Sequence, residues 1–336
     1  MRILVTGGAG YIGSQTARQL AGAGHDVVVL DDLARGHADA VRGLPLVVGD
    51  VRDAHLVAAT LREHSIEAVI HFAALKSVEE SNADPGAYFD VNVGGTLTVL
   101  RAMAATGVGA FVLSSSAAVY GPPVALPVEE SAPLRPLNPY GESKLMAERL
   151  LPWFETSHGI RYAALRYFNA AGADPGGAHG EDWRTAPNLI PIVLSVAAGR
   201  RPVLTINGMD HPTPDGSAIR DYIHVADLAD AHIRAVDAVT RPGGSFTLNI
   251  GTGRGASVLE VVDAARRITG REIPTVYGPR RVGDPPAVWA ATGAAKERLG
   301  WRAAFDLDDV IGSAWRWYEG HPAGYGDPAL LRESGA

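Results

Sequence analysis

The feature that most constrains the fold is a series of short apolar runs, rich in β-branched residues, that alternate with longer stretches of helical pattern. The central runs lack the polar alternation of a strand with one solvent face, so both faces are expected to be covered. Parallel strands joined by crossover helices meet this requirement, and we predict an α/β fold with a doubly wound parallel sheet. Its strands are predicted at residues 3–5, 26–30, 46–48, 68–72, 111–115 and 162–166.

The second half of the chain is less regular, and the change follows Asn169, where a glycine- and proline-rich stretch begins. Such stretches favour loops, so we predict one domain at residues 1–170 and a smaller C-terminal lobe at residues 171–336. A strand-like run at 247–250 is followed by a helical pattern at 257–269, and these segments are expected to return to the first sheet. Residues 222–270 are therefore expected to contribute to it, which makes the lobes partly interleaved. The tail after His321 is expected to be loosely held.

Composition excludes several classes of protein. The 336 residues are 46% hydrophobic and 20% charged, which is ordinary for a globular chain and excludes disordered and fibrous classes. A net charge of -7 gives no general attraction to nucleic acid or to an anionic membrane. The absence of cysteine excludes disulfides and thiolate ligands, and no histidine has metal-ligand spacing. We expect a cytoplasmic protein without metal, nucleic-acid or membrane partners.

A glycine-rich turn joins the first predicted strand to the first predicted helix. Gly7, Gly10 and Gly13 recur at every third position, with Tyr11 and Ile12 between the last two. Without Cβ atoms the turn can tighten and a pyrophosphate can approach the backbone, while the helix N-terminus offers N–H donors and a positive dipole end. The pattern alone also fits a glycine-rich turn without any ligand, so the surrounding sequence must distinguish the two interpretations.

That context is a carboxylate at the end of the second predicted strand. Asp31 follows Gly7 by 24 residues, where it can accept bonds from both hydroxyls of an adenosine ribose and repel a 2′-phosphate. The turn and Asp31 therefore predict a Rossmann-type domain that binds NAD. A helix-capping role for Asp31 or Asp32 is the alternative. Asp50 and Val51, after the third strand, are predicted to meet the adenine.

Two further segments suit catalysis on a hydroxyl group. Tyr140 and Lys144 are four residues apart and thus on one face of a helix, where a cation favours the phenolate of a nearby tyrosine. Three serines, at 114–116, end a predicted strand at the sheet edge where ligands gather. One of these hydroxyls can bridge a substrate oxygen and Tyr140. An exposed helix pair and a hydrogen-bonded turn are the structural alternatives.

Taken together, these motifs resemble the extended short-chain dehydrogenase/reductase family, and within it the UDP-glucose 4-epimerases. The resemblance covers nearly the whole chain. Its segments are residues 6–13, 71–76, 114–121, 139–144, 166–169, 220–225 and 279–284. No single segment is specific, whereas their combination is.

The resemblance implies roles for individual residues. Tyr140 matches the base that accepts the proton of the sugar 4-hydroxyl, Lys144 the residue that lowers its pKa and holds the nicotinamide ribose, and Ser116 their hydroxyl partner. Positions matching NAD contacts include Phe72, Ala73, Lys76, Asn92 and Phe168. Positions matching contacts to the UDP-sugar are Lys76, Asn169, Asn188, Leu189, Arg220, Arg281, Asp284 and Val288. Guanidinium groups suit a diphosphate, and Asp284 suits a ribose hydroxyl.

The implied reaction is reversible epimerisation of UDP-glucose and UDP-galactose at C4, through a 4-keto intermediate and bound NAD, as in galactose metabolism. Residues 1–170 would then bind NAD and residues 171–336 the UDP-sugar. The resemblance also implies a homodimer packed through helices near 96–106 and 143–154.

Three other functions are compatible with parts of the sequence. A nucleotide-sugar 4,6-dehydratase needs an acidic pair after the strand-end hydroxyl, where this chain has alanines at 117 and 118. A UDP-glucuronate decarboxylase needs recognition of a sugar carboxylate that the sequence does not indicate. A non-catalytic NAD-binding regulator on the same fold would not need Ser116, Tyr140 and Lys144.

Val288 bears on the breadth of substrate. In the family that the chain resembles, a bulky tyrosine here accompanies restriction to unsubstituted hexoses, and a small residue accompanies acceptance of 2-N-acetyl sugars. Valine is small, so activity on UDP-N-acetylhexosamines is expected. Packing of Val288 beneath Trp289 is the alternative.

Overall fold

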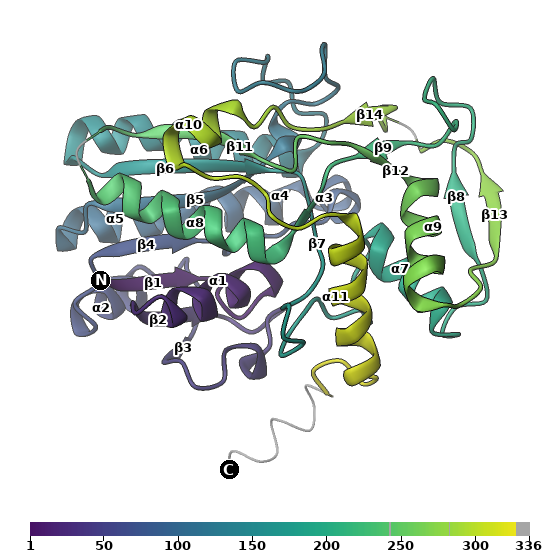
Figure 1. Cartoon of the computed structure of the whole chain (residues 1–336). Coiled ribbons are helices and arrows are strands. Elements are labelled where there is room, and N and C mark those ends of the chain that lie inside the picture. The colour runs from purple at the N-terminus through teal and green to yellow at the C-terminus, as the bar shows by residue number, and fades with distance from the viewer. Residues whose placement is uncertain (242, 282, 327–336) are drawn as a thin grey trace.

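The main sheet of the computed structural model consists of seven parallel strands with helices on both faces (Figure 1). Residues 1–241, 243–281 and 283–326 are described. The strands are β1 (Arg2–Thr6), β2 (Asp26–Asp31), β3 (Leu46–Val48), β4 (Ala68–His71), β5 (Ala110–Ser116), β6 (Arg161–Tyr167) and β11 (Phe246–Ile250). Their order is β11-β6-β5-β4-β1-β2-β3, and every neighbouring pair is parallel. The predicted doubly wound α/β fold is confirmed.

The late strand expected at 247–250 does return to this sheet, whereas the helix expected at 257–269 packs in the smaller lobe, against α7 (Leu189–Ala197) and α11 (Leu307–Gly320). Strand β11 pairs with β6, with Leu248 opposite Leu165 and Ile250 opposite Tyr167. The preceding helix, α8 (Val225–Thr240), packs on the same sheet and on α1 (Tyr11–Gly22). About 80 residues of the chain separate these two paired strands, so the lobes are interleaved in sequence.

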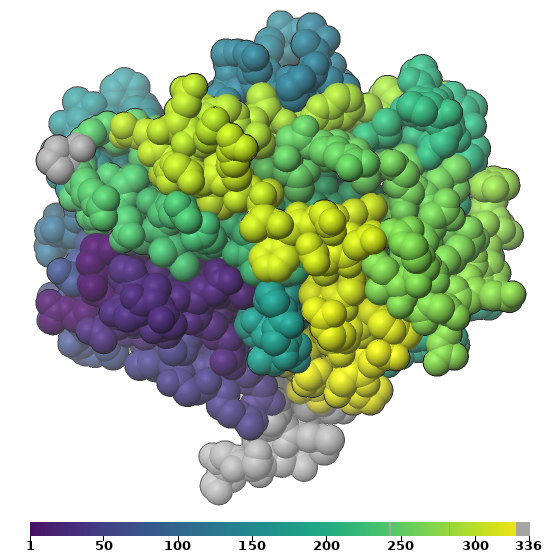
Figure 2. All heavy atoms as spheres, in the orientation of Figure 1, coloured from purple at the N-terminus to yellow at the C-terminus, as the bar shows by residue number. Residues whose placement is uncertain are grey.

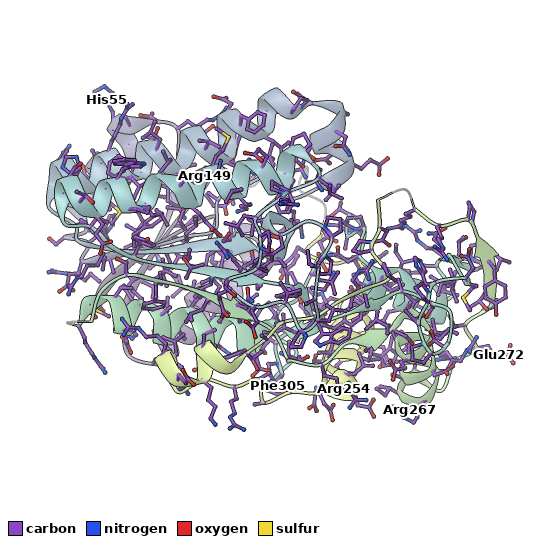
Figure 3. The ribbon with its side chains drawn as sticks, turned by 90° about the horizontal axis from the view of Figure 1, so that it is seen from above. His55, Arg149, Arg254, Arg267, Glu272 and Phe305 are labelled. Carbon is purple, nitrogen blue, oxygen red and sulfur yellow. The ribbon has the colours of Figure 1, made fainter. Side chains whose placement is uncertain are left out.

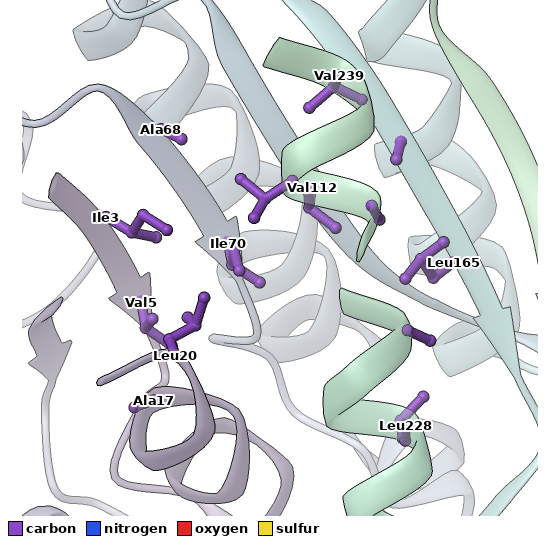
Figure 4. Close-up of a cluster of buried hydrophobic side chains, with 14 of the residues drawn as sticks. Ile3, Val5, Ala17, Leu20, Ala68, Ile70, Val112, Leu165, Leu228 and Val239 are labelled. Carbon is purple, nitrogen blue, oxygen red and sulfur yellow. The ribbon is translucent and has the colours of Figure 1, made fainter. Parts of the chain in front are cut away.

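Alternation along each strand explains why helices cover both faces. Ile3 and Val5 of β1 point to the face of α1 and α8, together with Ile70 and Val112 from neighbouring strands (Figure 4). Leu20 of α1 closes the same cluster. Side chains of a strand alternate between faces, so the intervening residues must be apolar as well if the second face is covered.

The second face is covered by α2 (Ala54–Glu63), α5 (Gly95–Thr106) and α6 (Pro139–His158). Leu4 lies between Ile3 and Val5 and packs on this side with Val69, Phe111, Leu100 of α5 and Leu151 of α6. Viewed from above, helices on the side of Arg149, which belongs to α6, and on the side of Phe305 enclose the sheet (Figure 3).

Several short elements complete this domain. They are η1 (Ala38–Val41), α3 (Val78–Ala83), α4 (Pro85–Tyr88), η2 (Phe89–Gly94), η3 (Ala117–Val119) and α10 (Gly293–Leu299). Element η2 is a single turn of π-helix between α4 and α5. Such turns reorient side chains, and η2 contains the predicted site residue Asn92.

The smaller lobe has its own core and three small sheets, in the orders β10-β7, β12-β9-β14 and β13-β8. Its strands are β7 (Asn169–Ala171), β8 (Leu204–Asn207), β9 (Ile219–Arg220), β10 (Tyr222–His224), β12 (Ala256–Ser257), β13 (Thr275–Gly278) and β14 (Ala287–Val288). Its helices are α7 (Leu189–Ala197), α9 (Val258–Thr269) and α11 (Leu307–Gly320). In the space-filling view, yellow C-terminal residues lie between the purple N-terminal segment and the green residues of this lobe (Figure 2).

The described part of the C-terminal tail is well packed, contrary to the expectation of a loosely held terminus. The Tyr325 hydroxyl donates to the carbonyl of Gly180 at 2.8 Å, and its ring stacks on His37 at 4.5 Å. A half-buried aromatic ring with a hydrogen-bonded hydroxyl outweighs the loop-forming glycines and prolines around it. The remaining tail residues, 327–336, lie outside the described part. Within the described residues, no helix is long and apolar enough to cross a membrane.

Buried histidines make the fold sensitive to acid. His71 is enclosed between Thr6 and Thr96, and burial, reinforced by the charge of Lys144, lowers its pKa to about 3. His232 on α8 lies against Phe72, and burial lowers its pKa to about 4. Both rings are therefore neutral in the folded protein at pH values where an unfolded histidine is protonated.

Replacing His232 with Phe should flatten the loss of stability in acid. The unfolded state binds the extra proton between pH 6.5 and about 4, so the His232 term lowers the free energy of unfolding as pH falls through this range. From pH 7 to pH 5 its contribution amounts to about 2 kcal/mol. Urea unfolding at both pH values should show His232→Phe losing about 2 kcal/mol less than the natural protein. Equal losses would contradict the assignment.

Candidate active site

The glycine turn has the geometry that close approach of a ligand requires. Gly7 has a φ of +68°, and a Cβ there would lie 2.4 Å from the amide nitrogen of Ala73. A Cβ on Gly13 would lie 2.2 Å from the carbonyl oxygen of Gly7. Gly10 is the N-cap of α1, with no side-chain cap and no acidic residue in the first turn. The positive end of this helix is therefore not neutralised by its own side chains.

The two residues that open α1 anchor it. The Tyr11 hydroxyl donates to the carbonyl of Gly172 at 2.6 Å, which joins the helix to the segment after β7. Burial raises the pKa of Tyr11 well above its usual value, and the charge of Glu181 adds to this. Ile12 packs against the core under α1 and α8.

Asp31 is buried at the end of β2 and supports the glycine turn. Its two oxygens accept hydrogen bonds from the backbone N–H groups of Ala9 and Leu33, both at 2.9 Å. Burial raises the pKa of Asp31, although these two bonds oppose the increase. Asp32 is exposed and accepts a bond from the backbone of Ala34 at 2.9 Å. Asp31 therefore ties two loops together at the predicted cofactor edge.

The residues after β3 are arranged around an arginine. Asp50 accepts hydrogen bonds from Arg52, which lowers the pKa of Asp50, and Arg52 also pairs with Asp90 of η2. Val51 is buried in the core beneath α2 and α5. The carboxylate of Asp50 therefore already has a charged partner.

The loop after β4 is held by an amide. Asn92 accepts from the Leu75 N–H at 2.8 Å and donates to the Leu75 carbonyl at 3.0 Å and to the Ser143 hydroxyl at 2.9 Å. Phe72 packs on His232, and Ala73 lies beside the glycine turn. Asn92 thus fixes the loop that runs along the sheet edge.

Helix α6 brings the predicted catalytic residues to the end of β5. Its N-cap Asn138 accepts a bond from the N–H of Gly141 at 2.9 Å. A Cβ on Gly141 would lie 2.6 Å from the carbonyl oxygen of Ala118, so the helix touches η3 directly. This contact sets Tyr140 beside Ser116, and the Ser116 hydroxyl lowers the pKa of the phenol.

Burial dominates the electrostatics of Tyr140 and Lys144. It raises the pKa of Tyr140, and the bond to Ser116 opposes the increase. The Lys144 ammonium donates to the carbonyl of Ser114 at 3.0 Å, and burial lowers its pKa to about 8, opposed by the charge of Glu148. The pKa of Tyr140 is thus raised by burial, and the side chain that lowers it is Ser116 rather than the expected Lys144.

Glu148 is a neighbour of this site that sequence reasoning missed. It lies one turn beyond Lys144 on α6, is buried, and accepts three bonds from the Arg166 guanidinium, at 2.9, 3.2 and 2.6 Å. The Ser115 hydroxyl donates to Glu148 at 2.5 Å. The signal that could have identified it is its spacing, because Glu148 follows Lys144 by four residues, as Lys144 follows Tyr140. The ion pair locks β5, β6 and α6 together.

Residues after β6 line the junction with the smaller lobe. Phe168 and Val288 pack on one small apolar cluster that includes Val119 and Leu145. Val288 therefore reaches the vicinity of β5 and α6 from β14. Asn169 is exposed at the start of β7, and its N–H donates to the carbonyl of Asp221 at 2.9 Å.

One carboxylate connects two other predicted residues. Lys76 Nζ and Asn188 Nδ2 each lie 3.1 Å from the same oxygen of Glu181, and Leu189 follows as the first residue of α7. Sequence reasoning did not single out Glu181 for this role. Its role as a shared acceptor depends on tertiary structure.

An ion pair in the smaller lobe involves two further predicted site residues. Arg220 forms an ion pair with Asp284 and donates to the carbonyl of Pro285 at 2.8 Å. Arg281 is exposed and makes no ion pair with any residue that the structure describes. Arg220 and Asp284, each predicted as a contact to the UDP-sugar, are thus brought together, with Arg281 in the same loop as Asp284.

Comparisons with known proteins agree with this geometry. Residues 3–251 match the family model described as NAD dependent epimerase/dehydratase family. A UDP-glucose 4-epimerase of Lacticaseibacillus casei is 48% identical over 329 residues, which cover 97% of this chain and 99% of that protein.

Solved structures agree as well. The Brucella ovis UDP-glucose 4-epimerase in complex with NAD is 47% identical, covers 94% of this chain and 97% of that chain, and has a TM-score of 0.91. A UDP-glucose 4-epimerase of Stenotrophomonas maltophila, with NAD and formylated UDP-arabinopyranose bound, is 43% identical, with coverages of 96% and 99% and a TM-score of 0.93. The chain therefore belongs to the NAD-dependent epimerase/dehydratase family, in its UDP-glucose 4-epimerase branch.

Proposed function

We propose that this chain interconverts UDP-glucose and UDP-galactose by inverting C4 of the hexose, with NAD as a bound cofactor. The observation that carries the proposal is the placement of Tyr140, Ser116 and Lys144 at the carboxyl edge of a sheet whose first turn is built for a dinucleotide. When bound, NAD supplies a reversible acceptor of hydride. The net reaction neither oxidises nor reduces the sugar.

The residues present fit NAD. The glycine turn and the uncapped N-terminus of α1 suit a pyrophosphate. A carboxylate has about four acceptor sites, and backbone N–H groups use two of those on Asp31, which leaves capacity for two ribose hydroxyls. We assign further cofactor contacts to the adjoining edge. They are Gly7, Gly10, Tyr11, Ile12, Gly13, Asp32, Asp50, Val51, Phe72, Ala73, Lys76, Asn92, Tyr140, Lys144 and Phe168.

Tyr140 accepts the proton of the 4-hydroxyl as that carbon is oxidised, and returns it when the opposite face of the keto sugar is reduced. Ser116 holds the phenol and the sugar oxygen in line. Because burial alone raises the pKa of Tyr140, positive charge at the site must favour its phenolate. Lys144, fixed by the Ser114 carbonyl, places one such charge next to the reacting atoms.

The smaller lobe holds the UDP end of the substrate. Arg220 and Arg281 suit the diphosphate, and Asp284 suits the uridine ribose. Lys76, Ser116, Tyr140, Asn169, Asn188, Leu189 and Val288 complete the proposed contacts. Binding at the UDP end retains the keto sugar while its hexose ring turns over. We accordingly assign NAD binding to residues 1–170, with residues 222–270 contributing, and UDP-sugar binding to residues 171–336.

The acid–base inventory around Ser116 favours epimerisation over dehydration. Expulsion of a 6-hydroxyl needs a further acid and base, and alanines follow Ser116. The buried carboxylate nearby, Glu148, is already engaged by Arg166 and Ser115. The cytoplasmic location expected from the sequence stays a prediction.

Replacement of Tyr140 with Phe tests the base and the reaction together. The natural protein, given UDP-galactose without added reductant, should form UDP-glucose, identified by chromatography. Tyr140→Phe should lower kcat at least about a hundredfold, because it removes the proton acceptor and little volume. Tyr277→Phe, at an exposed tyrosine of β13, is the matched control and should retain full turnover. No product from the natural protein supplied with NAD would reject the function, and near-native turnover of Tyr140→Phe would reject the base.

Val288 is proposed to leave room for a 2-acetamido group. It is half-buried beside Phe168, so a larger side chain there would extend toward the proposed hexose site. The natural protein should turn over UDP-N-acetylglucosamine. Val288→Tyr should lower the ratio of kcat/KM for UDP-N-acetylglucosamine to kcat/KM for UDP-glucose about tenfold or more. Val276→Tyr, on exposed β13, should leave the ratio unchanged. An unchanged ratio in Val288→Tyr would assign specificity to other residues.

We also propose that the enzyme is a homodimer formed through α5 and α6. Met146 and Trp153 are exposed on α6 although both are apolar, and their seven-residue spacing puts them on one face. A large exposed apolar face is typical of an interface. Trp153→Glu should therefore yield monomers in sedimentation equilibrium, whereas Val276→Glu should not. A natural protein that sediments as a monomer would refute the proposal.

A further inference from the structure

Glu181 occupies an unusual position between the two lobes. It lies in the segment between β7 and α7, and its side chain is only 8% exposed. A buried carboxylate needs compensation, since removing it from water is costly. The partners of Glu181 come from elements on opposite sides of the lobe junction.

Both partners reach the same oxygen. Lys76, 105 residues away in the loop after β4, donates from Nζ to Oε1 at 3.1 Å. Asn188, the N-cap residue of α7, donates from Nδ2 to Oε1 at 3.1 Å. The Asn188 side chain makes no capping bond to its own helix, so Glu181 sets its orientation. The Lys76 side chain is 54% exposed, and its ammonium group is held by the buried carboxylate of Glu181.

The backbone around Glu181 is held in place independently of these contacts. Its carbonyl accepts a bond from Trp317 Nε1 at 3.0 Å. The preceding Gly180 is bonded through both its N–H and its carbonyl to the Tyr325 hydroxyl, at 3.1 and 2.8 Å. The following Asp182 lies 3.2 Å from His37, which belongs to the loop after β2. The backbone that carries Glu181 is therefore fixed, and its carboxylate is oriented by its two donors.

The negative charge of Glu181 affects the groups that surround it. Tyr318 of α11 is buried and Tyr11 of α1 is half-buried, and desolvation followed by the negative charge of Glu181 raises the pKa of each phenol. Asp182 adds a second negative charge near Tyr318. Lys76 is the cation paired with Glu181. Loss of the Glu181 charge would leave this ammonium without its counter-ion.

We propose that Glu181 is a positioning residue that couples the cofactor edge to the UDP-sugar lobe by holding Lys76 and Asn188 on one oxygen. The inference rests on the proposed function, in which Lys76 faces NAD and Asn188 faces the UDP-sugar. A ligand that orders either donor also orders the shared acceptor, so the second ligand meets a preorganised partner. Coupling of this kind is reciprocal, so UDP strengthens retention of NAD to the same extent as NAD strengthens binding of UDP.

The test uses the holoenzyme and three carboxylate variants. Glu181→Gln keeps the size but removes the charge, and Glu181→Asp keeps the charge but is too short by one methylene to bridge both donors. Asp263→Asn is the control, because Asp263 pairs with Arg266 at the same 3.1 Å but on the exposed surface of α9. Loss of NAD during dialysis is measured with and without saturating UDP. UDP binding is measured by calorimetry, and KM and kcat for UDP-galactose are determined.

Saturating UDP should slow NAD loss at least about fivefold in the natural protein and in Asp263→Asn. This effect should fall below about twofold in both Glu181 variants, with UDP binding and KM weakened about tenfold and kcat changed much less. Should Glu181→Gln fail to fold by circular dichroism, Glu181→Asp carries the test.

Two results would overturn the coupling. One is a lowered melting temperature with unchanged KM and an unchanged effect of UDP on NAD loss, which would make Glu181 merely structural. The other is a natural protein in which UDP has no effect on NAD loss. Failure of UDP-galactose turnover would instead refute the proposed function, because the NAD and UDP measurements do not require catalysis.

Discussion

The structure depends on burying both faces of one parallel sheet. Leu4 packs beneath α2 and α5, while its neighbours Ile3 and Val5 pack beneath α1 and α8. With roughly 25 cal/mol gained per Å² of apolar surface removed from water, this double burial is the main stabilising term. Its functional consequence is geometric, because parallel strands align their carboxyl ends. The glycine turn, Asp31, Phe72 and Ser116 accordingly lie along one edge.

Buried charge is concentrated where that edge meets α6. Lys144 is held by a carbonyl, and Glu148 one turn further is neutralised by Arg166. A buried ion pair is a weak source of stability, but it specifies a unique arrangement when every bond is satisfied. Here the pair joins β6 to the helix that carries Tyr140, and the bond from Ser115 to Glu148 adds β5, the strand that carries Ser116. The same low-dielectric setting that costs stability makes the proton transfer at Tyr140 responsive to one nearby charge.

Local patterns were sufficient for much of the fold. Continuous apolar runs predicted six strands within about a residue at most ends, and a seventh at residues 247–250 was correctly expected to return to the sheet. The spacing of Tyr140 and Lys144 predicted one helix face, which α6 confirms. Such features are readable because strand and helix periodicities are properties of consecutive residues. The prediction of a loosely held tail was wrong for the described residues, because Tyr325 contacts His37 and Gly180, which are distant in the sequence.

The sequence by itself determined the fold class, the glycine turn and the residues that carry the family resemblance, because each depends on neighbours a few positions apart. Only the tertiary structure decided which side chains share a partner. Glu181 meets Lys76 across 105 residues, and Glu148 meets Arg166 across 18, through contacts that no local periodicity encodes. Burial was likewise decided by packing, and it governs the pKa of Tyr140 and Lys144 more than their four-residue spacing does. Desolvation is a property of the whole fold, so it cannot be read from a segment.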